Sequence, residues 1–220
     1  MRLTALKYGE TVLSEHLILQ GGERGKLYPI SLILYLIETE DRKLLVDAGC
    51  DTMPGFPLSG FCGPVAVLER YGVSPGEITD VILTHHHHDH AEGAIHFPTA
   101  RFWIQQAELE KCKRFLPDDA TVQIFEEEAS PCRGVRILRS GGHTVGSSVV
   151  ELIADRKRFV ICGDEIYHRM CVERGIPTGA SCCPERSRAF LETYGGGDVR
   201  LLLAHDGTIL PGQNGYLTIL

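Results

Sequence analysis

The sequence predicts an α/β (α+β) fold in which helices cover β-sheets. Short apolar runs of strand length alternate with turn signals along the whole chain. Strands dominate the central part with only a few helices between them, so a strictly alternating parallel sheet is not expected. No low-complexity linker and no clean repeat interrupts the 220 residues, which predicts a single domain over residues 1–220.

The first half of the chain begins with a predicted hairpin. Ile30–Glu38 is an apolar run of strand length, Lys43–Asp47 is its partner, and the polar segment 39–42 supplies the turn. Pro64–Tyr71 is predicted as a helix because Gly72 follows it as a stop signal. The next predicted elements are a strand at Asp80–Thr84, a strand at Arg101–Gln105 and a helix at Ala107–Leu116, which ends before Pro117.

The second half has the same pattern of short strands with one longer helix. Pro184–Tyr194 is predicted as this helix because proline is favoured at the first helical position and glycines follow the last. The predicted strands are Val135–Leu138, Ser148–Ile153, Arg158–Cys162 and Arg200–Ala204.

The composition is that of an ordinary globular chain. Hydrophobic residues make up 43% and charged residues 23%, which excludes disorder, collagen and coiled coil. The net charge of -7 and the lack of a basic face argue against a nucleic-acid partner. No run approaches the ~20 apolar residues of a membrane span, so no membrane partner is expected. Eight cysteines without a CxxC motif are typical of reduced thiols, which predicts a cytoplasmic location.

Five of the ten histidines lie within the segment Thr84–His90. An expression tag would be terminal, whereas this run is internal. A nonspecific histidine-rich metal-binding tract usually lies in a biased, flexible segment, whereas an apolar strand precedes this one. A core histidine would explain one residue of the five. A metal site explains them better, because neutral imidazole and carboxylate are the preferred ligands of zinc in open catalytic sites.

The spacing within this segment predicts how it would bind metal. In an extended loop His85 and His87 project to one side and the intervening His86 to the other. Asp89 and His90, at the bend of the loop, can then face a second metal. One short loop can therefore supply two ions, which together activate water and polarise the bond that it attacks.

Three further ligand candidates follow the apolar strands of the second half. They are His143, Asp164 and His205, and each lies where a predicted strand ends. Polar residues in this position often build the sites of α/β proteins. Each alone could be a turn or capping residue, but the three together with the histidine segment make coincidence a poor explanation.

This ordered set resembles the metallo-β-lactamase-fold hydrolase superfamily. The residues that carry the resemblance are His85-x-His87-x-Asp89-His90, His143, Asp164 and His205. It extends from about Ser31 to His205, and Val46-Asp47-Ala48-Gly49 looks like the strand and turn that precede the family's active site. The resemblance implies a four-layer αβ/βα sandwich with two divalent metal ions at one edge.

The resemblance also implies a role for each ligand. One metal would be bound by His85, His87 and His143, the other by Asp89, His90 and His205, and Asp164 would bridge both together with a water or hydroxide. Zinc is the expected metal, and iron and manganese accept the same ligands.

Residue 164 narrows the expected reaction. True class B β-lactamases generally carry cysteine here, so Asp164 points to lactonase, thioesterase or phosphodiesterase branches. Asp164-Glu165-Ile166-Tyr167 resembles the Asp-x-x-Tyr arrangement of N-acyl homoserine lactonases, although Tyr167 could also be an ordinary packing residue. The expected enzyme is a lactonase-like metal-dependent hydrolase in which a metal-bridging hydroxide attacks an ester-like carbonyl. Asp89 and Tyr167 are its expected catalytic residues, and Tyr167 and His168 its expected substrate contacts.

The sequence also departs from the family pattern. Gly142-His143-Thr144-Val145-Gly146-Ser147 lacks the proline and second histidine of the family's Gly-His-Thr-Pro-Gly-His, so Ser147 alters the surroundings of the metals. A glyoxalase-II-like thioesterase is the nearest alternative, but the 15 residues after His205 are too few for that family's glutathione-binding region (220 − 205). A small phosphodiesterase is a further alternative.

Two alternatives come from other classes. An iron-dependent oxidoreductase of the same fold is the first, although diiron reductase relatives usually carry glutamate at the position of His87. A zinc-storing or zinc-sensing protein is the second, and the open ligand set argues against it. The expected partner is a small-molecule substrate, and the apolar strand edges would permit a homodimer.

Overall fold

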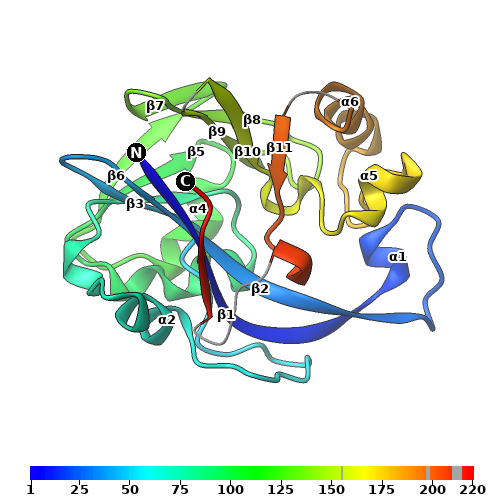
Figure 1. Cartoon of the computed structure of the whole chain (residues 1–220), viewed down its shortest axis with the longest axis horizontal. Helices are drawn as coiled ribbons and strands as arrows, with labels where there is room; N and C mark the ends of the chain where they lie inside the picture. Colours follow the sequence, from blue (N-terminus) through cyan, green and yellow to red (C-terminus); the bar gives the residue numbers. More distant parts are fainter. Residues whose placement is uncertain (155, 197–198, 210–214) are drawn as a thin grey trace. The chain divides into compact units, whose positions relative to one another are not determined.

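The computed structural model describes residues 1–154, 156–196, 199–209 and 215–220. Within them the chain divides into two compact units, each containing a β-sheet with helices (Figure 1). The first unit comprises Met1–Thr11, Ser31–Phe125 and Gly207–Leu220, and the second comprises Val12–Ile30 and Glu126–Asp206. The predicted α/β class is confirmed. The prediction of one domain over residues 1–220 stays a prediction.

Among the described residues, the first sheet has seven strands in the order β12-β1-β2-β3-β4-β5-β6. They are β1 (Arg2–Ser14), β2 (Leu27–Glu38), β3 (Lys43–Val46), β4 (Asp80–Leu83), β5 (Arg101–Gln105), β6 (Thr121–Phe125) and β12 (Tyr216–Thr218). The predicted hairpin is β2–β3, which pairs antiparallel. Strands β3 to β6 are parallel to one another. The residues after β4 therefore lie at the carboxyl edge of a parallel sheet, where α/β proteins build their sites.

Helix α2 (Pro64–Tyr71) supplies part of the core of the first unit. Its Val67 and Leu68 are fully buried in one cluster with Leu45 of β3 and Val81 of β4. The helix ends at Gly72, whose φ of +97° is the left-handed conformation that glycine adopts without steric cost. All four residues of β4 are buried, as expected for a strand inside a parallel sheet.

The second sheet has five strands in the order β11-β10-β9-β8-β7 among the described residues. They are β7 (Glu128–Cys132), β8 (Val135–Arg139), β9 (Ser148–Ala154), β10 (Lys157–Ile161) and β11 (Val199–Leu202). β9 is antiparallel to both β8 and β10, and β11 is parallel to β10. Strands β8, β10 and β11 therefore run in the same direction. The residues that follow these three strands all lie at the same edge of the sheet.

Among the described residues, the α-helices of the second unit are α1 (Glu15–Ile18), α5 (Met170–Arg174) and α6 (Pro184–Tyr194). Helix α6 has the predicted bounds (Figure 1). Its Phe190 and Leu191 lie in one core cluster with Val160 of β10. Burial of these side chains on the sheet stabilises the helix more than its intrinsic propensity does.

The predicted helix Ala107–Leu116 is shorter than expected and starts later. The segment 107–116 forms only the short α4 (Leu109–Cys112) and a 3-10 turn at Lys113–Phe115. The Gln105 side chain accepts the N–H of Ala107 at 2.6 Å, and Glu108 is drawn into a buried contact with His86. These side-chain contacts hold residues 106–108 as a turn, so the helix begins later. Within the described part of the chain, no helix has the length and apolar character required to cross a membrane.

Candidate metal centre

The histidine segment leaves the carboxyl end of β4 and enters a short helix, α3 (His88–Ala91). His85 and His90 are almost completely buried, at 1% and 2% exposure. The ring centroid of His85 lies 4.6 Å from that of His87 and 4.2 Å from that of His90. Three imidazoles therefore crowd together, and the Asp89 carboxylate lies 3.7 Å from Nε2 of His90.

The other two histidines of the segment have different partners. Glu108, which is buried, accepts the backbone N–H of His86 at 3.1 Å and also contacts Nδ1 of its ring. His88 lies at the surface, where its Nε2 donates to the Thr52 carbonyl at 2.9 Å. The His86 ring centroid lies 4.8 Å from that of His87, but the His86 ring contacts Glu108, and among the described residues it joins neither ligand group.

Asp47 orients two of the crowded imidazoles. This buried carboxylate accepts Nδ1–H of His90 at 2.8 Å and the Thr84 hydroxyl at 3.0 Å. Because the Thr84 hydroxyl donates to Asp47, it accepts Nδ1–H of His85 at 3.1 Å. Both rings therefore carry their proton on Nδ1 and keep the Nε2 lone pair for another partner, which is the tautomer that a metal ligand requires.

The backbone around Asp47 is suited to this role. Asp47 has a φ of +62°, a left-handed conformation that aspartate tolerates better than most residues. Its carboxylate also accepts the Thr84 N–H at 2.8 Å. Tyr8 supports the neighbouring turn by donating to the Asp89 carbonyl at 2.9 Å, and burial raises the pKa of this tyrosine well above its ordinary value. Tyr8 and the orienting function of Asp47 were not predicted from the sequence.

In the second unit, the three strand-end candidates come together at the shared edge. His143, Asp164 and His205 are 5%, 3% and 2% exposed and follow β8, β10 and β11. Oδ2 of Asp164 lies 3.4 Å from Nε2 of His143, and Oδ1 lies 3.1 Å from Nε2 of His205. The ring of His143 is fixed from its other side, where Nδ1 contacts the carbonyl of Ala180. The two oxygens of one carboxylate thus face two different imidazoles.

Tyr167 packs against both of these histidines. Its ring stacks on that of His205 at a centroid distance of 5.1 Å and an angle of 17°, and meets His143 edge-on at 5.7 Å. His168 has a different environment, since its Nδ1 accepts the N–H of Met170 at 3.2 Å where α5 begins. Tyr167 therefore lies against the candidate ligands, whereas the His168 ring takes part in the turn that follows.

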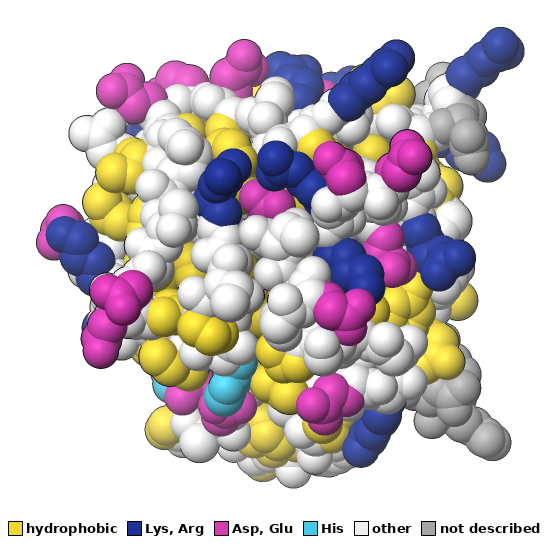
Figure 2. Space-filling model, turned by 90° about the vertical axis from the view of Figure 1, so that its left-hand side faces the viewer, with side chains coloured by type: hydrophobic (Ala, Val, Ile, Leu, Met, Phe, Trp, Pro, Cys, Tyr) yellow, Lys and Arg dark blue, Asp and Glu magenta, His cyan; other side chains and the backbone are white. Residues whose placement is uncertain are grey.

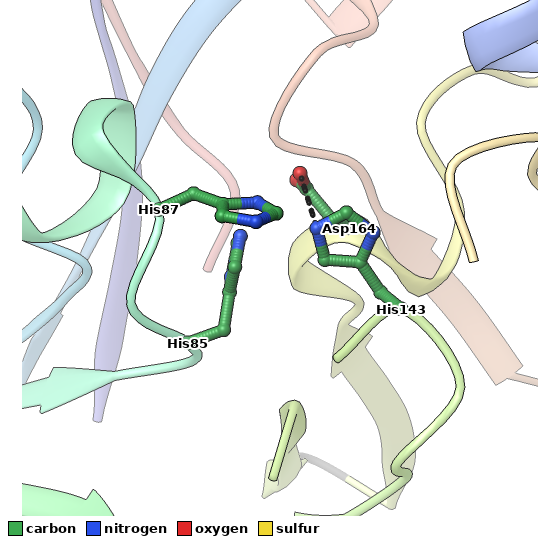
Figure 3. Close-up of side chains that lie close together, drawn as sticks. All are labelled: His85, His87, His143 and Asp164. Atoms are coloured by element: carbon green, nitrogen blue, oxygen red, sulfur yellow. Dashed lines mark ion pairs between the residues drawn. The ribbon is translucent and has the colours of Figure 1, made fainter. Parts of the chain in front are cut away.

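All seven candidate ligands fall into two groups in which ligand atoms lie within 4.8 Å of one another. The first group is His85, His87, His143 and Asp164 (Figure 3), and the second is Asp89, His90 and His205. Among the described residues, no other histidine and no cysteine joins such a group. Cys162, the nearest cysteine in sequence to Asp164, is buried and contacts the Val160 carbonyl. Imidazole nitrogens and carboxylate oxygens in these numbers fit divalent zinc, iron or manganese.

Curated relatives of the chain include hydrolases of two kinds. An N-acyl homoserine lactonase of Bacillus sp is 28% identical over 177 residues, which cover 70% of this chain and 71% of the relative. A hydroxyacylglutathione hydrolase of Acidiphilium cryptum (strain JF-5) is 31% identical over 123 residues, covering 51% and 46%.

Among solved structures, an N-acyl homoserine lactone hydrolase with the product N-hexanoyl-L-homoserine bound at its catalytic metal center shares the fold. The TM-score is 0.83 at 21% identity, and the match covers 98% of both chains. Together with the hydrolase relatives and the histidine–aspartate groups, this defines the chain as a metal-dependent hydrolase.

The family model of the metallo-beta-lactamase superfamily matches residues 34–199, and the chain belongs to this superfamily. The resemblance seen in the sequence and the predicted fold are therefore confirmed.

Proposed function

We propose that the chain is a dinuclear, lactonase-like hydrolase of ester bonds. The observation that carries this proposal is the position of the Asp164 carboxylate. Its two oxygens face His143 and His205 at 3.4 and 3.1 Å, and these histidines belong to different ligand groups. A carboxylate in that position is suited to bridge two cations, each completed by its own set of imidazoles.

The two groups support a division of the ligands between two sites. One site would be formed by His85, His87 and His143, the other by Asp89, His90 and His205, with Asp164 shared. When bound, a pair of divalent cations supplies an ionised water near neutral pH and polarises the carbonyl that it attacks. Zinc is the metal that we propose, since buried Nε2 lone pairs and carboxylates suit it.

Two residues of the chain would act on the substrate. Asp89 holds its carboxylate beside His90 and can accept the proton released as the nucleophile forms. Tyr167 lies against His143 and His205, and its hydroxyl can donate to the oxyanion or the leaving oxygen. His168 stays a weaker candidate for substrate contact, because its ring is used in the turn before α5.

Lactones are the proposed substrates. Relatives that match 70% of this chain at 26–28% identity are N-acyl homoserine lactonases. The aspartate at position 164 and the tyrosine three residues later agree with this branch. A glutathione thioester is the second candidate substrate, supported by the 31% identity to a hydroxyacylglutathione hydrolase.

Metal analysis combined with a substrate panel tests the proposal. Protein purified without chelator should contain about two zinc or manganese ions per chain and hydrolyse a lactone faster than a glutathione thioester or a phosphodiester. His87→Ala should lose metal and turnover. His88→Ala is the matched control, because His88 belongs to the same segment but contacts Thr52 at the surface, and it should keep both.

Other outcomes separate the alternatives. If the protein binds two metals but hydrolyses the thioester or the phosphodiester faster than the lactone, the proposed substrate is overturned and the proposed dinuclear site stands. One iron per chain without hydrolysis would overturn the proposal in favour of redox chemistry. Two tightly held zinc ions without turnover of any panel member would favour storage or sensing.

We propose a small molecule, rather than a nucleic acid or a membrane, as the partner. On the face shown in Figure 2, Lys and Arg side chains lie among Asp and Glu and form no continuous basic patch. The chain carries eight cysteines and no CxxC motif, which is typical of reduced thiols and supports our proposal of a cytoplasmic location. Light scattering during gel filtration would test the proposed homodimer.

A further inference from the structure

A second carboxylate lies directly after Asp164 and has a different set of contacts. Glu165 is 1% exposed and belongs to the 3-10 turn Gly163–Glu165. Its Oε1 accepts the backbone N–H groups of Gly142 and His143 at 3.0 and 2.9 Å. The same oxygen accepts the hydroxyls of Ser140 and Ser147 at 2.8 and 2.6 Å.

These donors all belong to the segment that carries His143. They lie on the connection between β8 and β9, while Glu165 is joined by a peptide bond to Asp164. The carboxylate therefore binds the backbone of one candidate ligand and is covalently next to another. Hydrogen bonds to an ionised acceptor are roughly twice as strong as neutral ones, so this contact fixes the two ligands relative to each other.

The chain around Glu165 is shaped to admit the carboxylate. A Cβ at Gly142 would overlap with Oε2 of Glu165 and with the Ser187 hydroxyl, and would lie 2.8 Å from the Ser187 nitrogen. The Ser187 hydroxyl also lies 3.3 Å from Oε2. Ser147 occupies the position at which the family pattern has its second histidine. A glycine and three serines thus surround the buried Glu165 carboxylate.

We propose that Glu165 is a positioning residue for the metal centre, which holds His143 and Asp164 in ligand geometry in place of the second histidine of the family pattern. This inference rests on the proposed function. Glu165 acts through the His143 backbone and its own link to Asp164, and needs no contact with substrate. Its removal should weaken the ion held by His143 more than the ion held by His90.

The test compares two buried glutamates. Glu165→Gln should lower the affinity for one of the two zinc ions by about 10–100-fold, measured by competition with a chromophoric chelator. Glu151→Gln is the matched control, since Glu151 is a buried glutamate of β9, 3% exposed, that bonds to Arg136 and Arg158 at 3.1 and 2.8 Å. It should leave both zinc affinities unchanged, whatever its effect on the melting temperature of the metal-free protein.

The outcomes distinguish the inference from the proposed function. Wild-type affinities in Glu165→Gln would overturn the inference, and so would an equal loss in Glu151→Gln, which would indicate general destabilisation. A wild-type protein that binds fewer than two ions would instead overturn the proposed function. If Glu165→Gln does not fold, Ser147→Ala decides. Ser147→Ala should lower the affinity for that one zinc ion by about 2–10-fold, which is the effect of losing one hydrogen bond. An unchanged zinc affinity in Ser147→Ala would overturn the inference.

Discussion

At the scale of single residues, Asp47 connects the two ligand groups. It bonds to His90 directly and to His85 through Thr84, and these histidines belong to different groups. The Asp47 carboxylate accepts three donors at once: Nδ1–H of His90, and the N–H and hydroxyl of Thr84. An asparagine amide would present only one acceptor oxygen, because its other group is an NH₂ donor. Asp47 is therefore expected to set the ring orientation of one imidazole at each metal.

Asp47→Asn should reduce zinc affinity and lactone turnover by about 10–100-fold, because it disturbs His85 and His90 without touching a metal. Isothermal titration with zinc and initial rates measure the two effects. Asp51→Asn is the control, since Asp51 is nearby in the chain but bonds to His96 at 2.6 Å. Equal losses in the two variants would contradict the assignment.

The cysteines should differ widely in reactivity. Burial raises the pKa of Cys50 and Cys112 to about 12 and that of Cys171 to about 11, and it also raises the pKa of Cys162. Only the thiolate is alkylated, so these four should stay unmodified at pH 8, whereas the exposed Cys182 is labelled. Peptide mass spectrometry after brief iodoacetamide treatment measures this. Early labelling of Cys162 in the native protein would refute it.

At the scale of elements, helix α1 carries a buried carboxylate, Glu15, that bonds to the segment after the helix. Glu15 accepts the N–H of Glu23 at 3.1 Å, and the Lys26 and Tyr28 side chains at 2.9 Å each. These contacts lower the pKa of Glu15 from 4.5 to about 2, and the hydrogen bond from the Glu23 N–H has the largest effect. The Glu15 carboxylate therefore joins α1 to the start of β2 whenever it is ionised.

This shift predicts a pH dependence. A carboxylate whose pKa is depressed on folding stabilises the native state above its ordinary pKa, and the effect is lost as the pH falls. Wild type should therefore have a higher free energy of unfolding than Glu15→Gln at pH 7. This difference should shrink below pH 4.5 and vanish near pH 2. Urea midpoints of both proteins between pH 7 and 3 measure it. A difference that stays constant over this range would contradict the prediction.

At the scale of the whole molecule, metal should contribute to stability. The candidate ligands extend from residue 85 to residue 205, and an unfolded chain cannot gather them. Free zinc at 100 times its dissociation constant adds about 2.7 kcal/mol per site, which is roughly 5–11 °C in Tm for a chain of this size. Scanning calorimetry with and without EDTA measures the change. An unaltered Tm after complete zinc removal would refute the prediction.

The sequence predicted most buried strands well, because apolar runs are a local signal, and the residues that it named as candidate ligands do lie close together. Their role as ligands stays a prediction. Strand β5 and helices α2 and α6 have the predicted bounds. β1 was not predicted, since its pattern is interrupted by polar residues such as Thr4, which is buried but lies 3.2 Å from the Tyr71 hydroxyl. An alternating or apolar pattern reveals a strand only when its polar side chains face water.

The residues that support the site could not be predicted, because their roles depend on distant partners. Asp47 and His90 are 43 positions apart, and Tyr8 and Asp89 are 81 apart. Nothing in the sequence indicates that Glu165 accepts four hydrogen bonds from residues 140–147. Only the ordering of β8 and β10 in the sheet brings these segments together.

The pairing of β1 with β12 has a consequence for biosynthesis. Thr4 lies opposite Thr218, so the earliest strand of the sheet waits for a partner made 214 residues later (218 − 4). At about 5–20 residues per second, that wait lasts roughly 10–40 s. Until then β1 is an open sheet edge, the kind of surface on which other chains add strands. The emerging chain is therefore expected to expose residues 4–6 of β1 as a sheet edge until β12 pairs with them.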